Sequence, residues 1–77
     1  MGLATVLQRD LKKGMRGDDV KQWQRLLLGQ GFDPGAVTGV FNAQTRQATI
    51  DFQTSHGLDG TGIVDQRTRE RVAQGKP

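Results

Sequence analysis

The sequence predicts an all-α protein, a compact three-helix bundle with an internal duplication and short loop pairings. The first observation is a repeat, because the segment from Thr38 to Arg46 returns with substitutions as the segment from Thr61 to Arg69. The second is that three stretches begin with a capping residue and continue with apolar residues at helical spacing. A repeated unit of this size cannot bury its apolar face alone, so the two copies are expected to pack together.

A first helix is predicted from about Asp18 to Gln30. Either Asp18 or Asp19 is expected to cap it, because a carboxylate accepts hydrogen bonds from the free N–H groups of the first turn and suits the helix dipole. Gly29 and Gly31 stand where a left-handed C-cap is needed. The buried face consists of residues that recur at helical spacing, namely Val20, Trp23, Leu27 and Leu28.

A second helix is predicted from about Ala43 to His56. Asn42 is its expected N-cap, and Gly57 is expected to end it. One face of this helix carries Thr45, Ala48, Thr49 and Phe52. The glutamine after Phe52 repeats the pair formed by Trp23 and Gln24. Gln24 and Gln53 are therefore predicted to satisfy backbone groups of the loops, with ligand contact as the alternative.

A third helix is predicted from about Gln66 to Ala73, with Asp65 as its N-cap. Val72 is its main apolar residue, so its own sequence anchors this helix weakly. The apolar pairs Val40-Phe41 and Ile63-Val64 each follow a glycine in the connecting loops. They are expected to extend briefly and to form short pairings.

The domain organisation follows from these elements. Residues 11–74 are expected to form one domain, at the small end for a single hydrophobic core. Residues 1–10 are expected to form an N-terminal turn or helix packed on the bundle, because apolar residues recur there at helical spacing, namely Leu3, Val6, Leu7 and Leu11. Residues 75–77 are expected to be a frayed tail.

Composition limits the function. The net charge of +3 suits an anionic partner without naming one. The absence of cysteine excludes disulfides, a thiol nucleophile and a cysteine-ligated metal. No apolar run approaches the roughly 18 residues of a membrane span. The first ten residues lack the pattern of a signal peptide, so the chain is either made without export or cut from a longer exported protein. A monomer is expected.

Two ordered sets of residues resemble a known family. The run Leu11–Val20, followed by Trp23-Gln24, Leu27 and Gly31-Phe32, resembles the opening half of a peptidoglycan-binding domain of the first type, a small helical module attached to many cell-wall hydrolases. The second half of that domain is matched in order and spacing by Gly39-Val40-Phe41, Thr45, Ala48, Phe52-Gln53, Gly57-Leu58, Gly62-Ile63-Val64, Thr68 and Val72. The resemblance covers about residues 11–73.

The resemblance implies a non-catalytic module that binds bacterial cell-wall peptidoglycan, without a cofactor. It would hold a covalently linked or associated hydrolase near its polymer, in the cell wall, periplasm or extracellular space, as part of an exported or phage-released protein. The sequence departs from the family where Thr38 and Thr61 replace the aspartate that usually precedes each loop glycine. Because those aspartates can shape the ligand groove, the type of ligand stays open.

The site residues are chosen by their chemistry. Without tyrosine and with one tryptophan, predicted to be core, the chain can hardly build an aromatic platform for sugars. This favours the stem peptide or its carboxylates over bare glycan, because arginine grips carboxylates in a bidentate way. The expected surface is the groove between the second and third helices with the loops before them. The candidate contacts are Phe32, Asn42, Gln44, Thr45, Arg46, Arg67 and Thr68.

Other classes of function are weighed against this one. An enzyme is not expected, since His56 is the only histidine and the hydroxyls have no evident base partner. A small basic three-helix domain can place a helix in the major groove of DNA, but acidic residues interrupt every helix, so nucleic acid is not the expected partner. Nucleic-acid binding and protein interaction on the same fold remain the alternatives.

Overall fold

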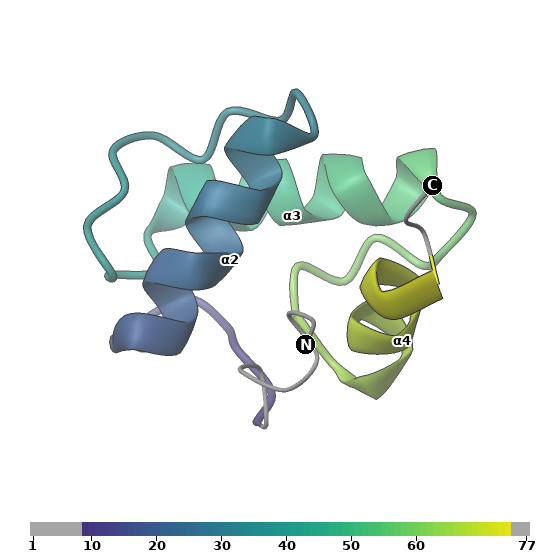
Figure 1. The fold of residues 1–77 in the computed structure, drawn as a ribbon, viewed down its shortest axis with the longest axis horizontal. Helices are drawn as coiled ribbons and strands as arrows, with labels where there is room; N and C mark the ends of the chain where they lie inside the picture. The colour runs from purple at the N-terminus through teal and green to yellow at the C-terminus, as the bar shows by residue number, and fades with distance from the viewer. Residues whose placement is uncertain (1–8, 75–77) are drawn as a thin grey trace.

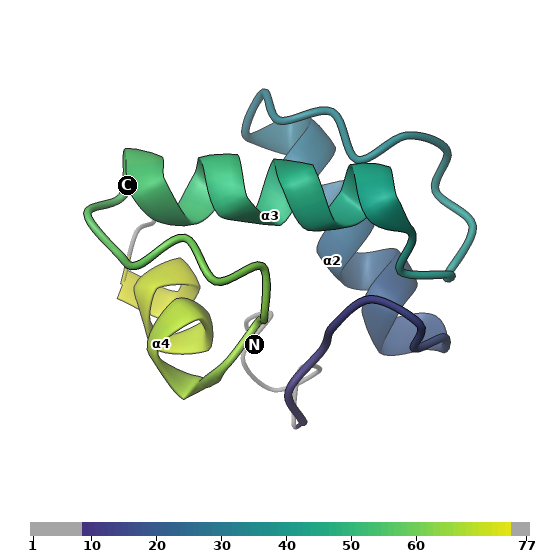
Figure 2. The same ribbon diagram turned by 180° about the vertical axis from the view of Figure 1, so that it is seen from behind.

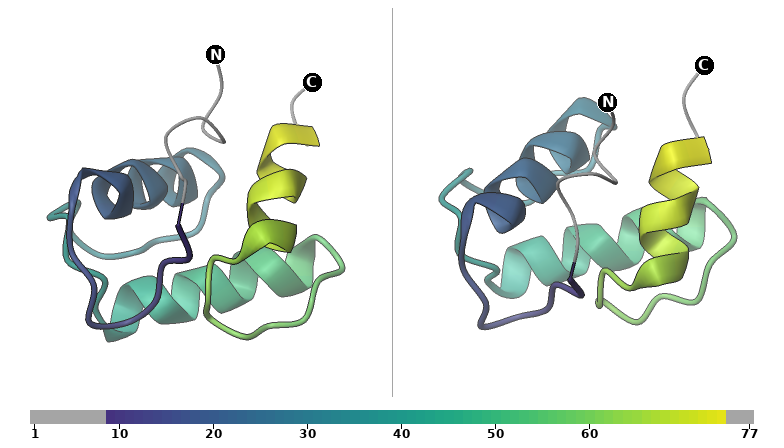
Figure 3. Two further views of the ribbon diagram at one scale, coloured as in Figure 1. Left: turned by 90° about the horizontal axis from the view of Figure 1, so that it is seen from below. Right: turned by 60° about the horizontal axis from the view of Figure 1, so that its bottom comes forward.

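The computed structural model describes residues 9–74, with side chains described for residues 9–72. It contains helices α2 (Asp18–Gly29), α3 (Ala43–Ser55) and α4 (Gln66–Gln74). Figures 1 and 2 show α2 crossing the first half of α3 and α4 lying beside its second half. Figure 3 shows that α2 and α4 lie on the same side of α3. The predicted all-α class with three helices is confirmed for this part of the chain.

Residues 9–74 form no sheet, and the predicted short pairings are two isolated antiparallel bridges. Leu11 pairs with Val64, and Arg16 pairs with Val40. Both loop segments therefore pair with the chain that precedes α2, which ties the two loops together. The predicted N-terminal turn or helix at residues 1–10 falls mostly outside the described residues, and the predicted tail at 75–77 does so entirely.

The helix ends lie within one residue of those predicted. Asn42 caps α3, since its Oδ1 accepts from the N–H of Thr45 at 2.8 Å. Asp65 Oδ1 accepts from the N–H of Thr68 at 3.0 Å at the start of α4. Helices α2 and α3 each lead into a glycine with positive φ, at Gly31 and Gly57. The predicted caps of α3 and α4 are confirmed, as are Gly31 after α2 and Gly57 after α3, whereas Gly29 is the last residue of α2 and has no positive φ.

Two expectations for α2 are wrong. Its N-cap residue is Gly17, which has a positive φ of 147° and no side-chain cap, and Asp18 and Asp19 lie inside the first turn. The Asp19 carboxylate instead binds Arg9 and the N–H of Val20. Leu28 is 50% exposed, because a residue next to Leu27 lies about 100° around the helix from the buried face.

The core lies where α2, α3 and the two loops meet. Trp23 and Phe52 are buried and pack edge to face with ring centroids 5.3 Å apart. Trp23 Nε1 also donates to Thr49 Oγ1 at 2.9 Å. The predicted core role of Trp23 is therefore confirmed. The fully or nearly fully buried apolar side chains are Leu11, Val20, Trp23, Leu27, Phe41, Ala48, Phe52 and Val64.

An ion pair ties the segment before α2 to the first turn of that helix. Arg9 Nε donates to Asp19 Oδ2 at 2.7 Å, and Arg9 Nη2 donates to the carbonyl oxygen of Arg16 at 3.0 Å. The hydrogen bond from Arg9 lowers the pKa of the Asp19 carboxyl and raises the pKa of the Arg9 guanidinium. The folded state therefore favours the charged form of Asp19.

This ion pair is expected to make stability depend on pH in acid. Because folding lowers the pKa of Asp19, the pair stabilises fully above the pKa of the unfolded carboxyl, about 4, and the contribution is lost as the pH falls through the folded value. Asp19→Asn should remove part of the fall in melting temperature between about pH 5 and pH 1. The effect should be modest, since Arg9 is exposed to solvent. Melting curves with Asp18→Asn as the control test this, and equal slopes for all three proteins would contradict it.

Candidate ligand-binding site

The first loop is held by the side chain of Gln24, which is fully buried. Its Oε1 accepts from the N–H groups of Thr38 at 3.0 Å and Gly39 at 2.9 Å. Its Nε2 donates to the carbonyl oxygen of Val40 at 2.9 Å and to Thr45 Oγ1 at 3.0 Å. One side chain on α2 thereby fixes the loop and the start of α3, which confirms the predicted structural role of this glutamine.

The second loop is held in the same way by Gln53, which is also buried. Its Oε1 accepts from the N–H of Gly62 at 2.9 Å. Its Nε2 donates to the carbonyl oxygen of Ile63 at 2.8 Å and to Thr68 Oγ1 at 3.0 Å. A longer contact of 3.3 Å joins it to Thr61 Oγ1. The structural role predicted for this second glutamine is confirmed too.

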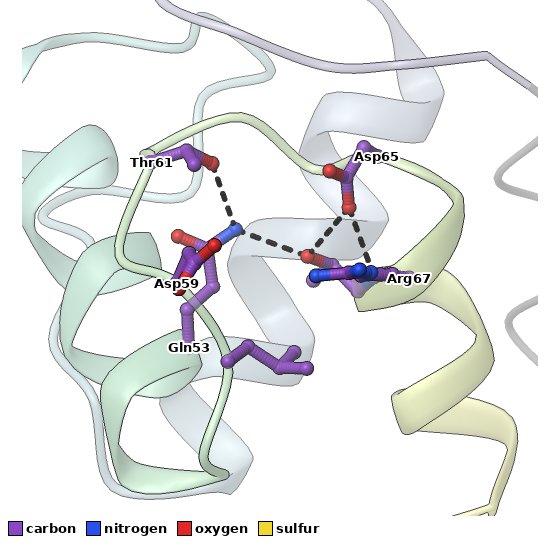
Figure 4. A pocket seen from close by; sticks show the side chains of 7 residues that line it. Gln53, Asp59, Thr61, Asp65 and Arg67 are labelled. Carbon is purple, nitrogen blue, oxygen red and sulfur yellow. Dashed lines mark hydrogen bonds between the residues drawn. The ribbon is translucent and has the colours of Figure 1, made fainter.

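A small recess lies beside the side chain of Gln53, between the end of α3 and the start of α4. Its volume is about 50 Å³, and we call it the loop recess; Figure 4 shows polar side chains around it. A wider recess of about 260 Å³ shares two lining residues with it. The loop recess is lined by Gln53, Leu58, Asp59, Thr61, Asp65, Arg67 and Thr68. The wider recess is lined by Leu58, Arg67, Glu70 and Arg71.

Thr45 and Thr68, two of the predicted contacts, are buried. Thr45 Oγ1 accepts from Gln24 and donates to the carbonyl oxygen of Pro34 at 3.0 Å. Thr68 Oγ1 accepts from Gln53 and donates to Asp65 Oδ1 at 3.1 Å. The structure gives both threonines a structural role, but only Thr68 lines the loop recess.

Three further predicted contacts lie away from the loop recess. Phe32 is half-buried and packs edge to face on Phe52 with centroids 5.9 Å apart, which makes it a loop anchor. Asn42 is exposed, but its side-chain oxygen caps α3. Gln44 is exposed and lies over the backbone of Gly35 in the first loop. These residues border the first loop, whereas the recess borders the second.

The arginines on α3 and α4 differ in their contacts. Arg67 lines both recesses and Arg71 lines the wider one. Arg46 lies on α3 against the backbone of Gly62 and lines neither. Arg69 donates to Asp10 Oδ1 at 2.8 Å and is mostly shielded. Of these four arginines, Arg67 and Arg71 therefore share one recess.

Sequence reasoning missed the carboxylates and the apolar wall of the recess. Asp59 and Asp65 bring two acceptors to a site predicted only for anions, and Leu58 forms the wall between the two recesses. The shorter second loop was the available signal, because it brings Asp59 close to the helix start. The arrangement offers donors from Arg67 beside carboxylate acceptors, which suits a ligand that carries both charges.

No three His, Cys, Asp or Glu side chains in the described part of the chain lie together as metal ligands would. None of the helices within residues 9–74 is long and apolar enough to cross a membrane.

A third recess, of about 360 Å³, lies by the first loop and is lined by Arg16, Gly17, Asp18, Lys21, Thr38, Gly39 and Val40.

Comparisons with known proteins agree on one family. Residues 16–72 match the family described as "Putative peptidoglycan binding domain". The chain is 41% identical over 68 residues to the carboxy-terminal processing protease CtpB of Bacillus subtilis, which covers 88% of this chain and 14% of that protein. It is 33% identical over 64 residues to the spore cortex-lytic enzyme of Oceanobacillus iheyensis, covering 83% of this chain and 23% of that one.

The fold is also that of a solved structure. The crystal structure of the Burkholderia AP3 phage endolysin matches with a TM-score of 0.82 and 32% identity, over 90% of this chain and 26% of that chain. The chain thus spans only 14 to 26% of these longer proteins. Because the family match takes in all three helices but the last residues of α4, the chain belongs to the peptidoglycan-binding domains of the first type.

Proposed function

We propose that this chain is a non-catalytic module that binds peptidoglycan through the stem peptide and its carboxylates, rather than through bare glycan. The observation that carries this proposal is a contrast in exposure: the aromatic side chains are shielded, whereas Arg67 and Arg71 lie at the surface. All four aromatic side chains, Trp23, Phe32, Phe41 and Phe52, are buried or half-buried, so none offers a platform for a sugar. Arg67 and Arg71, in contrast, line a recess that suits a carboxylate.

The module is proposed to act by tethering. Attached to or associated with a cell-wall hydrolase, it raises the effective concentration of that enzyme at its polymer, so weak binding by the module is sufficient. The endolysin and the spore cortex-lytic enzyme, both much longer than the matched region, support this role. The proposed location is the cell wall, periplasm or extracellular space, and the proposed state is a monomer.

The two halves of the domain are inferred to be copies of one unit. In each, a buried glutamine after an aromatic residue binds a loop glycine N–H, the carbonyl of the next residue and a threonine hydroxyl. In each, that threonine lies three residues after the N-cap that accepts from its N–H. Because matching residue types make the same hydrogen bonds in both halves, these contacts support an internal duplication.

Sedimentation with purified sacculi tests the proposed function. Peptidoglycan freed of protein and teichoic acid should retain the protein at low and at moderate salt, because hydrogen bonds and packing respond less to salt than phosphate contacts do. Retention that disappears steeply with salt, together with equal binding to duplex DNA, would favour the nucleic-acid alternative. No retention at any salt concentration would mean that this domain has kept the fold without the ligand.

Removing two arginines should weaken wall binding. Arg46→Ala with Arg67→Ala is expected to reduce retention on sacculi by about tenfold, on the order of one charge-assisted contact. Thermal stability should stay nearly unchanged, since both side chains are exposed. Because only Arg67 lines a recess, its single variant should carry most of the loss. Arg25→Ala, an exposed arginine on α2, is the control for charge, and retention equal to that control would remove the anion-groove idea.

A further inference from the structure

The two loops held by Gln24 and Gln53 differ in length. Gln24 and the loop residue Thr38 are 14 positions apart, whereas Gln53 and Thr61 are 8 apart, so the second connection has six fewer residues. In the first connection the buried Pro34 lies over the start of α3, and its carbonyl oxygen accepts from the Thr45 hydroxyl. The first connection therefore supplies the carbonyl acceptor for Thr45, the threonine that Gln24 holds.

The second connection supplies no such carbonyl. The N–H of Thr61 turns back to the carbonyl oxygen of Asp59 at 2.9 Å, which closes the loop tightly. The hydroxyl of Thr68 donates instead to Asp65 Oδ1, an oxygen that already accepts the N–H of the same threonine at 3.0 Å. The loop recess borders this hydroxyl, on the threonine that corresponds to Thr45.

We propose that the loop recess binds a peptide carbonyl of the stem peptide, in place of the carbonyl that Pro34 supplies in the first half. The inference rests on the proposed function and names the part of the ligand that enters. The Thr68 hydroxyl rotates from Asp65 to donate to the ligand carbonyl, and the carboxylate keeps its bond from the Thr68 N–H. The exchange replaces a charge-assisted hydrogen bond to Asp65 by a neutral one, but it leaves no polar group without a partner.

The size of the recess selects a small residue. A volume of about 50 Å³ holds a carbonyl group and a methyl group but not a large side chain, since one water needs about 10 to 15 Å³ by the same kind of measure. The wider recess continues past Leu58, and its charged lining consists of Arg67 and Arg71 with one carboxylate, Glu70. A small residue that ends in a free carboxylate, such as the terminal D-alanine of a stem tetrapeptide, fits both recesses in sequence.

Preorganisation supports the site. Gln53 and Thr68 are buried, and Gln53 fixes the Thr68 oxygen through Nε2 at 3.0 Å. Asp59 lines the same recess and offers an acceptor for an N–H of the ligand. Because these groups are already in place, binding spends little free energy on ordering them.

Titration of the ¹⁵N-labelled chain with a synthetic stem tetrapeptide that ends in D-alanine tests this inference. Saturable chemical-shift changes are expected at Thr61, Thr68 and the side-chain amide of Gln53. The same peptide with its C-terminus amidated should bind about tenfold more weakly, the loss of one charge-assisted contact. Shift changes confined to the first loop, or equal affinity for the two peptides, would overturn the assignment.

Matched threonine variants separate binding from folding. Thr68→Val should weaken peptide binding by about tenfold, and Thr68→Ser should bind within about twofold of the unchanged chain. Thr45→Val removes the corresponding hydroxyl in the first half, where Pro34 already supplies the carbonyl acceptor, so it should lose stability but keep affinity. Equal affinity of Thr68→Val and Thr45→Val would overturn the proposal. If Thr68→Val does not fold, Leu58→Trp is measured instead, because it fills the wall between the recesses without removing a buried hydrogen bond, and unchanged affinity would be equally decisive.

The proposed function and this inference fail in different ways. Sacculi that do not retain the unchanged chain would refute the proposed function itself. Sacculi that retain it, together with a tetrapeptide that shifts no residue of the loop recess, would refute only the assignment of the carbonyl site. Retention with shifts at Thr68 supports both.

Discussion

Replacing Gln24 by leucine is expected to destabilise the domain by about 2 to 5 kcal/mol. A buried donor or acceptor left without a partner costs about 1 to 3 kcal/mol. This substitution removes the acceptor of the Gly39 N–H, which is buried, and the donors to Val40 and Thr45. A chain of this size has about 4 to 12 kcal/mol of stability in all, so the variant should be largely unfolded or close to it at 37 °C.

Urea unfolding followed by circular dichroism and by Trp23 fluorescence measures this effect. Gln22→Leu, a half-buried glutamine on the same helix that does not hold the loop, is the matched control and should change stability by no more than about 0.5 kcal/mol. Gln53→Leu should resemble Gln24→Leu, because its amide makes the same kinds of contact in the second loop. An unfolding midpoint for Gln24→Leu equal to that of the control would show that water satisfies the loop without the amide.

Local signals in the sequence predict most of this fold. Asn42 and Asp65 cap their helices because each side chain acts on a backbone N–H three residues away, and no distant group competes. Asp19 follows the same rule in the sequence, yet its carboxylate binds Arg9, ten residues earlier. Which partner an aspartate chooses depends on how the preceding segment packs, and helical periodicity carries no such information.

The site was less predictable than the fold for a similar reason. The sequence selects Arg67 by its charge, but the recess beside it arises from a loop that is six residues shorter than its counterpart. Leu58 and Asp59 lie in that shorter loop and line the recess. Thr45 and Thr68 are alike in sequence context, and only the packing of Pro34 over one of them distinguishes their surroundings. A recess beside a shortened loop leaves no residue motif of its own.

Replacing Trp23 by alanine is expected to cost about 3 to 5 kcal/mol, the range for a buried aromatic residue. Trp23 is fully buried, contacts Phe52 edge to face and donates to Thr49. The cavity would lie between α2 and α3, so little of it can collapse without separating the helices. Circular dichroism during urea unfolding is the measurement, because the variant has lost the only tryptophan.

Trp23→Phe separates packing from hydrogen bonding at the same position. It keeps a ring against Phe52, and Thr49 Oγ1 retains its own bond to the carbonyl oxygen of Thr45 at 2.8 Å, so no donor is stranded. Its cost should be about 1 to 2 kcal/mol, well below that of the alanine variant. If Trp23→Ala instead stays fully folded and loses retention on sacculi, the indole is a ligand contact. The core must then be held without it, by Phe41, Phe52 and the buried side chains of Gln24 and Gln53.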